Sequence, residues 1–247
     1  MRRGRISVYK AVFLDLDNTI FSFDEMYKKT SHEALNQVIG IQELGLAFPS
    51  FYETFRSIAD ELYFEYEKGK RTMDSYRDER WIRTFKHFKI PIEQDKMKEL
   101  NEYIVSNYLD HVEPFTGARE FLQRLQERYR VGLITNGPVE MQLAKLGKMN
   151  MMSYFEKDLV IISEEIGVSK PDPRIFQQAL ARAGMTAEEA VHMGDSMKHD
   201  IVGANGIGMA SALIHTEKTD LANQVPTYHF RDFFDAAEVF FNKVENV

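Results

Sequence analysis

Residues 10–15 read Lys-Ala-Val-Phe-Leu-Asp, a short unbroken apolar run that ends in an acid. Such a run is typical of a strand that is buried on both faces of a parallel sheet. The second half of the chain repeats this pattern of an apolar run followed by polar residues. Clear repeats cover residues 131–134, 159–162 and 190–193, and a weaker repeat covers residues 209–214. The sequence therefore predicts a set of buried, parallel strands.

Segments with helical spacing of their apolar residues lie between these strands. They cover residues 118–128, 139–148, 174–183 and 200–206. Asp172-Pro173 has the sequence of an N-cap followed by a proline in the first helical turn. Alternation of strand and helix predicts a parallel sheet with helices on both faces, which is a doubly wound, Rossmann-like α/β fold.

The segment from about Phe23 to Val112 follows a different pattern, because it contains no comparable apolar strand. Its aromatic and aliphatic residues recur every three or four positions, which predicts an all-helical insertion. Gly69-Lys70 and Ile90-Pro91 have the composition of turns between its helices.

We therefore expect a discontinuous α/β core domain formed by residues 1–21 and 113–247, with a helical domain of residues 22–112 inserted into it. The tail from Phe230 to Val247 is predicted to be a closing amphipathic helix, with Asp232 near its start.

The composition is that of a globular protein. The chain has 247 residues, of which 44% are hydrophobic and 28% charged, which excludes disordered and collagen-like classes. Its formal net charge of −7 argues against a nucleic-acid or anionic-membrane partner. Because the chain has no cysteine, disulfides, thiolate metal sites and cysteine nucleophiles are excluded. No apolar run reaches the length of a membrane span, and we expect a cytoplasmic protein.

Side chains capable of chemistry follow the ends of the predicted strands. Because the carboxyl ends of parallel strands meet at one edge of a sheet, where ligands bind, we expect these side chains to converge. They are Asp15 and Asp17 after the first strand, Thr135 and Asn136 after the second, Lys170 a few residues past the third, and Asp195 and Asp200 after the fourth.

This set of residue types points to phosphate chemistry. Three close carboxylates repel one another unless a cation or protons intervene, and oxygen ligands favour Mg²⁺. A lysine and a hydroxyl would supply further positive charge and hydrogen bonds to a phosphate. In the absence of cysteine and of a Gly-x-Ser-x-Gly motif, the best nucleophile at the end of the first strand is the Asp15 carboxylate. Asp17, two residues further on, can then serve as acid and base.

Four stretches resemble, in order and spacing, the motifs of the haloacid dehalogenase (HAD) superfamily. They are Asp15-Leu-Asp-Asn-Thr19, Ile134-Thr-Asn-Gly137, Lys170-Pro171 and Gly194-Asp-Ser-Met-Lys-His-Asp200. The helical insertion between the first two motifs looks like that family's helical cap of the first type. Residues 19–24 and 160–171 look like the pyrimidine 5′-nucleotidase subgroup that acts on noncanonical nucleotides.

The resemblance implies a two-step phosphoryl transfer. Asp15 would attack phosphorus and form an aspartyl-phosphate. Asp17 would protonate the leaving alcohol and then take a proton from the water that hydrolyses the intermediate. The Asp15 carboxylate, the Asp17 backbone carbonyl and Asp195 would bind Mg²⁺, and Asp200 would support that metal shell.

The resemblance also implies how the phosphate is held. Thr135 and the backbone amide of Asn136 would bind phosphate oxygens. Lys170 would offset the charge between the anionic nucleophile and the anionic phosphate.

The predicted function is Mg²⁺-dependent hydrolysis of a small phosphorylated metabolite, with a nucleoside 5′-monophosphate as the favoured substrate. A sugar phosphate or phosphoglycolate phosphatase and a phosphomutase remain alternatives, because they use the same residues. A metal-independent 2-haloacid dehalogenase is less favoured, since it needs neither Asp17 nor Asp195. A non-enzymatic phospho-acceptor switch has no need of the helical insertion. Both a monomer and a homodimer are compatible with the sequence.

Overall fold

The computed structural model describes residues 9–67, 69–216 and 225–241, and the chain divides into two compact units. We call residues 1–23 together with 112–247 the α/β unit, and residues 24–111 the helical unit. The outermost residues of the predicted core segments, 1–8 and 242–247, lie outside the described part of the chain.

The α/β unit is built on a six-stranded sheet with the strand order β3-β2-β1-β4-β5-β6. Every neighbouring pair runs parallel, which confirms the doubly wound, Rossmann-like prediction. The strands are β1 (Ala11–Leu14), β2 (Arg130–Thr135), β3 (Val160–Ile162), β4 (Ala190–Gly194), β5 (Ala210–Ile214) and β6 (Tyr228–Phe230). The last of these was not predicted. It is a three-residue edge strand whose middle residue, His229, is exposed, so it leaves no apolar run in the sequence.

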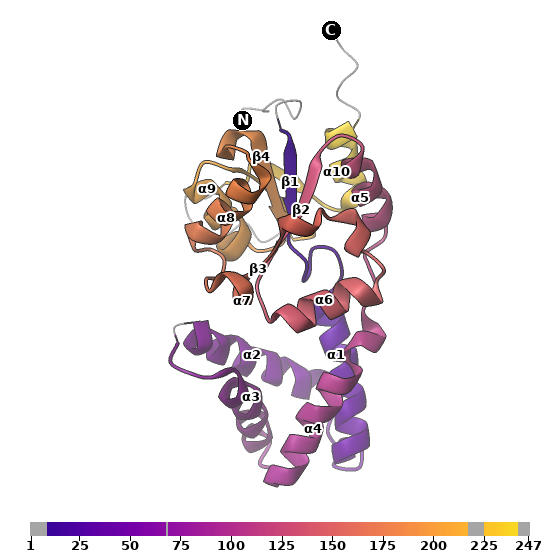
Figure 1. The fold of residues 1–247 in the computed structure, drawn as a ribbon. Helices are drawn as coiled ribbons and strands as arrows, with labels where there is room; N and C mark the ends of the chain where they lie inside the picture. Colours follow the sequence, from indigo (N-terminus) through magenta and orange to yellow (C-terminus); the bar gives the residue numbers. More distant parts are fainter. Residues whose placement is uncertain (1–8, 68, 217–224, 242–247) are drawn as a thin grey trace. The chain divides into compact units, whose positions relative to one another are not determined.

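Helices cover both faces of this sheet, with α8 and α9 on one face and α5 and α10 on the other (Figure 1). The helices of the α/β unit are α5 (Ala118–Gln126), α6 (Val139–Lys148), α7 (Ser163–Ile166), α8 (Pro173–Ala183), α9 (Val202–Gly206) and α10 (Phe233–Phe241). Shorter helical turns lie at 152–154, 157–159, 187–189 and 197–201.

The central strand β1 supplies side chains to both faces because successive residues of a strand point to opposite sides. Phe13 is fully buried in a hydrophobic cluster between the sheet and α8. The same cluster contains Ile134 of β2 and Phe176 of α8. On strand β2, the residue next to the Phe13 ring is Gly132. A Cβ atom at Gly132 would lie 2.5 Å from two atoms of that ring. The absence of a side chain at Gly132 is therefore what lets Phe13 occupy the centre of this face.

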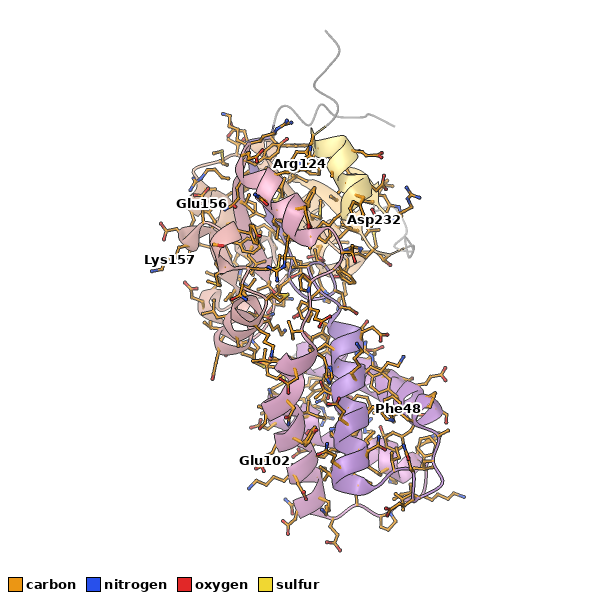
Figure 2. The ribbon with its side chains drawn as sticks, turned by 90° about the vertical axis from the view of Figure 1, so that its right-hand side faces the viewer. Phe48, Glu102, Arg124, Glu156, Lys157 and Asp232 are labelled. Carbon is orange, nitrogen blue, oxygen red and sulfur yellow. The ribbon has the colours of Figure 1, made fainter. Side chains whose placement is uncertain are left out.

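The opposite face is covered by α5 and α10, which lie side by side in both views. Phe121 of α5 is buried against Phe233 and Phe240 of α10, with ring centroids 5.2 and 5.6 Å apart. Figure 2 shows Arg124 on α5, and its guanidinium carbon lies 4.1 Å from the centre of the Phe241 ring. The aromatic side chains of α10 thus close this face of the sheet.

Two predicted helix starts are confirmed by their caps. Asp172 accepts a hydrogen bond from the Arg174 backbone N–H at 2.9 Å, with Pro173 in the first turn of α8. Asp232 accepts one from the Asp235 N–H at 2.8 Å at the start of α10. The remainder of the predicted closing helix, residues 242–247, lies outside the described residues.

The helical unit has its own core. It contains α1 (Phe23–Ala34, of which Phe23 belongs to the α/β unit), α2 (Phe48–Glu67), α3 (Met73–His87) and α4 (Gln94–Asn107), with a π-helical turn at 35–39 and a 3₁₀ turn at 108–111. The predicted turns at Gly69-Lys70 and Ile90-Pro91 lie between α2 and α3 and between α3 and α4. Aromatic residues of α2 and α3 dominate the core, with Phe55 stacked on Trp81 at 4.0 Å.

The two connections between the units run close together where they meet the sheet. Ile20 accepts a backbone hydrogen bond from Phe115 at 2.8 Å, and Phe21 and Pro114 form an antiparallel bridge. The chain therefore leaves the α/β unit and re-enters it at neighbouring points. None of the described helices has both the length and the apolar composition that crossing a bilayer requires.

We expect Gly132→Ala to destabilise the protein by about 1–3 kcal/mol, because the new methyl group would overlap the Phe13 ring in a filled core. Gly147→Ala in α6 is the matched control, since no atom lies within 4 Å of its Cβ position. Equilibrium urea unfolding of both variants measures the difference. Equal stabilities would contradict this account of the core.

Candidate active site

The carboxyl ends of β1 and β4 form the centre of the candidate site. The order of the strands reverses between them, since β2 and β3 follow on one side of β1 and β4 to β6 on the other. Asp15 directly follows β1, and its N–H donates a hydrogen bond of 2.8 Å to the Met193 carbonyl of β4. Asp195 directly follows β4. This is the position at which open parallel sheets bind their ligands.

Four of the predicted side chains meet here. Asp15, Asp195 and Asp200 each offer one carboxylate oxygen, and these oxygens lie within 4.8 Å of one another. The Lys170 ammonium lies between two of these acids, with Nζ 2.6 Å from Asp15 Oδ1 and 2.6 Å from Asp200 Oδ1. Lys170 is only 3% exposed, so its charge depends on these two carboxylates for compensation.

The charges of this cluster are unequally distributed. Burial raises the pKa of Asp15 from 3.8 to about 7 and that of Asp195 to about 8, and the Asp200 charge adds to both effects. Burial opposes ionisation of Asp200 too, but Lys170 and His192 hold its pKa well below the usual range. Burial alone would lower the pKa of Lys170, yet Asp15 and Asp200 raise it. Asp200 and Lys170 are thus a fixed ion pair, whereas Asp15 and Asp195 lack sufficient positive charge.

Asp200 has both oxygens occupied by the protein. Oδ1 lies 2.8 Å from His192 Nε2 as well as beside Lys170, and Oδ2 accepts a hydrogen bond of 3.0 Å from the Ser196 N–H. The π-helical turn at 197–201 brings Asp200 back against the end of β4. A Cβ atom at Gly194 would overlap the Asp200 carboxyl group, so only glycine leaves room for this return.

Asn136 positions Lys170 through its side chain. Its Nδ2 donates to the Lys170 carbonyl at 3.1 Å, and its Oδ1 accepts from the Lys170 N–H at 2.8 Å. A side-chain amide is suited to this role because it matches one donor and one acceptor of a backbone unit. Since the Asn136 side chain is used in this way, its backbone N–H is what it can offer to a ligand.

Asp17 lies in a second cluster, on the side of α6. Lys145 Nζ donates to both of its carboxylate oxygens, at 2.7 and 2.9 Å, and Gln142 Nε2 lies 3.1 Å from Oδ2. The same Gln142 nitrogen lies 3.0 Å from Thr135 Oγ1 and 2.5 Å from the Asn136 carbonyl oxygen. The Asp17 carboxylate is therefore not part of the three-carboxylate group that contains Asp15.

Several residues of the site are absent from the sequence-based prediction. They are Gln142 and Lys145 of α6, His192 of β4, and Thr19, whose Oγ1 lies 3.4 Å from Asp195 Oδ1. The signal for the first two was present in the sequence. Gln142 and Lys145 share a helix face with the buried Leu146, so they are polar residues at positions that helical spacing assigns to the interior.

The donor set fits a hard divalent cation. Burial, together with the charge of Asp200, raises the pKa values of two of the three carboxylates, and oxygen ligands of this kind are those that Mg²⁺ prefers. Asp15 and Asp195 can contribute oxygens directly, whereas the oxygens of Asp200 are occupied. The cluster can thus hold a metal ion beside a carboxylate nucleophile and an ammonium group.

Comparison with known proteins gives consistent matches. The family model for haloacid dehalogenase-like hydrolases matches residues 48–214. The chain is 28% identical to the pyrimidine 5′-nucleotidase YjjG of Escherichia coli, over 83% of this chain and 85% of that protein. It is 32% identical to a ribulose-1,5-bisphosphate 5-phosphatase of Halopiger xanaduensis, over 88% and 91% of the two chains. The fold resembles the magnesium-bound HAD-hydrolase YfnB of Bacillus subtilis, with a TM-score of 0.78 and 22% identity over 94% and 99% of the chains.

The raised pKa values of Asp15 and Asp195 predict a pH-dependent stability. The folded protein holds protons that the unfolded chain, with carboxyl pKa values near 3.8, has already released. Their contribution to stability is therefore fully present below about pH 3.8, is lost progressively as the pH rises above that value, and is gone once the pH has passed the folded-state pKa values of about 7 and about 8. We expect the melting temperature of the metal-free protein in EDTA to fall by several degrees between about pH 6 and about pH 8.5.

Asp195→Asn should flatten this dependence, because it removes one of the two titrating groups. Mg²⁺ should raise the melting temperature of the unmodified protein more at the high pH than at the low pH, since it competes with protons for the same oxygens. A melting temperature that does not change over this range would contradict the assignment of the two acids.

Proposed function

This chain belongs to the haloacid dehalogenase-like hydrolases, and from that membership we propose that it hydrolyses phosphoric monoesters of small metabolites through a covalent intermediate on Asp15. The observation that carries the proposal is the meeting of the Asp15 carboxylate, the Lys170 ammonium and the Asp195 carboxylate at one edge of the sheet. A phosphate placed there would face a nucleophile, a cation and a metal ligand together.

Asp15 is the nucleophile. Among the described residues, its side chain receives one hydrogen bond, from Lys170 to Oδ1. Oδ2 is therefore the oxygen that attacks phosphorus. A bond forms between this oxygen and phosphorus while the bond from phosphorus to the leaving oxygen breaks. Lys170 offsets the negative charge that collects between the carboxylate and the phosphate.

Asp17 is the acid and base. It gives a proton to the leaving oxygen in the first step and becomes ionised. In the second step it takes a proton from the water that attacks the phosphoryl group, and the bond from phosphorus to Asp15 breaks to release phosphate. The hydrogen bonds from Lys145 and Gln142 are suited to the ionised form that links the two steps.

Thr135 and Asn136 hold the phosphate oxygens. Thr135 Oγ1 accepts a hydrogen bond from Gln142, which leaves the hydroxyl hydrogen to donate to a phosphate oxygen. The Asn136 side chain is held by the Lys170 backbone, so Asn136 donates through its backbone N–H. These two donors lie at the end of β2, next to the strand that carries the nucleophile.

Asp15, Asp195 and the backbone carbonyl of Asp17 would hold Mg²⁺, which supplies positive charge to the phosphate oxygens when it is bound. Asp200 supports these ligands without binding the metal itself. Its contacts with Lys170, His192 and Ser196 fix the ammonium that faces Asp15.

A nucleoside 5′-monophosphate is the substrate that we propose, supported by the similarity to a pyrimidine 5′-nucleotidase. The similarity to a ribulose-1,5-bisphosphate 5-phosphatase favours a sugar phosphate as the second candidate. We propose that residues 22–112 act as a cap that selects between such leaving groups.

We expect the protein to release phosphate from pyrimidine nucleoside 5′-monophosphates in the presence of Mg²⁺ and to lose this activity in EDTA. Asp15→Asn should lower the rate by orders of magnitude, because the attacking oxygen is replaced by an amide nitrogen. Asp172→Asn is the matched control, since asparagine also caps helices and the Asp172 side chain contacts only Arg174 among the described residues. The measurement is phosphate release from a panel of nucleotides, sugar phosphates and phosphoglycolate.

Release from sugar phosphates alone would keep the mechanism and replace the substrate. Transfer of phosphate back to the substrate would identify a phosphomutase. Full activity of Asp15→Asn would overturn the mechanism, as would chloride release from a 2-haloacid without metal.

A further inference from the structure

Helix α6 places two polar side chains on its buried face. Gln142 is 1% exposed and Lys145 is 3% exposed, one helical turn apart. Burial of an ammonium group is costly unless it is paired, and leucine or methionine would fill the same space without that cost. The presence of Lys145 therefore calls for an explanation beyond the packing of α6.

Both side chains are directed at Asp17. Lys145 gives three hydrogen bonds, two to the Asp17 carboxylate and one of 2.8 Å to Gln142 Oε1. The Gln142 amide nitrogen also lies within hydrogen-bond distance of the Asn136 carbonyl and Thr135 Oγ1, so its two hydrogens are shared among three acceptors, one of which is Asp17. On another side, Lys145 Nζ lies 5.1 Å from the Phe23 ring centre and 5.7 Å from that of Phe21. Lys145 and Gln142 therefore have fixed positions, and so does the carboxylate that they contact.

We propose that Gln142 and Lys145 are positioning residues that hold the Asp17 carboxylate at the angle at which it delivers its proton to the leaving oxygen. This inference rests on the proposed function, because it assigns a support to the acid of that reaction. An acid acts only within hydrogen-bond reach of the leaving oxygen, so the two residues contribute through geometry rather than by touching substrate.

A positioning role for Lys145 and Gln142 predicts a dependence of the rate on the leaving group, which a role in packing alone does not predict. An alkyl alkoxide, such as the 5′-oxygen of a nucleoside, is a poor leaving group and needs a proton as it departs. The p-nitrophenolate ion leaves readily without one. Displacement of Asp17 should therefore slow hydrolysis of a nucleoside monophosphate much more than hydrolysis of p-nitrophenyl phosphate.

The test compares Lys145→Met and Gln142→Leu with the unmodified protein on uridine 5′-monophosphate and p-nitrophenyl phosphate, with Mg²⁺ present. We expect kcat/KM for the nucleotide to fall by about 10²-fold, and by about tenfold or less for the phenyl ester. Lys148→Met, an exposed lysine on the same helix, is the matched control and should change neither value. In an Asp17→Asn background, Lys145→Met should cause no further loss on the nucleotide.

An equal loss on both esters, or a further loss in the Asp17→Asn background, would show that Lys145 serves folding alone and would overturn the inference. Gln142→Leu provides the same comparison if Lys145→Met does not fold. If the unmodified protein hydrolyses neither ester, the inference is overturned, and the panel of nucleotides, sugar phosphates and phosphoglycolate decides separately whether the proposed function fails with it.

A second, independent observation concerns Arg80 of α3, in the helical unit. Arg80 is only 8% exposed, and its guanidinium carbon lies 5.0, 5.3 and 4.9 Å from the ring centres of Tyr27, Phe55 and Tyr76. A guanidinium is always charged, and buried charges are normally paired with an acid.

Arg80 has no such partner among the described residues. Of its five N–H donors, only Nε has a hydrogen bond, a long one of 3.3 Å to the Arg77 carbonyl, and no described carboxylate lies within 4 Å. Other arginines of the same unit are paired. Arg56 lies 3.1 Å from Asp24, and Arg71 lies 2.7 Å from Glu65. The aromatic rings compensate part of the Arg80 charge, and the terminal N–H groups, which have no acceptor among the described residues, stay within reach of solvent.

We infer that Arg80 is the anchor of an anion site that takes a carboxylate or phosphate group of a small metabolite. Such oxyanions accept the paired hydrogen bonds that a guanidinium offers.

The chain contains its own probe for this site. Trp81 is its only tryptophan, adjacent in sequence to Arg80 and stacked on the same Phe55 ring at 4.0 Å. Fluorescence of Trp81 in the full-length protein, with EDTA present, can be titrated with inorganic phosphate and, separately, with malonate. We expect a saturable change with at least one of them, and the responding anion identifies the group as phosphate or carboxylate.

Arg80→Met should weaken this binding by about tenfold or more, since hydrogen bonds to a charged group are lost. Arg83→Met, on the same helix but paired with Glu79 at 2.8 Å, should leave it unchanged. A signal that does not saturate with either anion in the unmodified protein, or one that persists in Arg80→Met, would overturn the inference.

Discussion

The contact of one buried ammonium with two carboxylates organises the candidate active site. Lys170 lies 2.6 Å from an oxygen of Asp15 and 2.6 Å from an oxygen of Asp200, almost without exposure to water. An unpaired charge in that position would be strongly destabilising, so the geometry of all three groups has to be maintained together. Other features of the site follow from this requirement. Asn136 fixes the backbone of Lys170, His192 and Ser196 fix Asp200, and Gly194 leaves the space that Asp200 occupies.

The two acids that follow β1 are separated by a single residue but lie in different electrostatic surroundings. Asp15 is directed towards Lys170 and the acids after β4, whereas Asp17 is directed towards α6 and receives hydrogen bonds from Lys145 and Gln142. One short loop thus carries two carboxylates, and each is held in place by different residues. This separation suits a reaction in which one carboxylate forms a covalent bond and the other transfers protons.

The sheet and the residues at its edge were predictable, because a strand buried on both faces leaves a continuous apolar run and its last residue marks the ligand-binding edge. Asp15 and Asp195 were located in this way. What lies on helices was not predictable to the same degree. Helical spacing places Gln142 and Lys145 on the buried face of α6, but it does not specify that they contact Asp17, because that contact depends on how α6 packs against the loop after β1. The use of the Asn136 side chain depends on where Lys170 lies, 34 residues further along the chain.

The adjacent crossing points at Ile20–Phe21 and Pro114–Phe115 have a consequence for how the protein can diversify. Backbone hydrogen bonds between residues of the α/β unit close the chain there, so this closure does not use contacts made by the inserted segment. The segment between these points can lengthen, shorten or be replaced, while the strand ends that carry the candidate site keep their register. An ancestral core of this kind can acquire new specificities by changing an exchangeable part, without new constraints on its catalytic geometry.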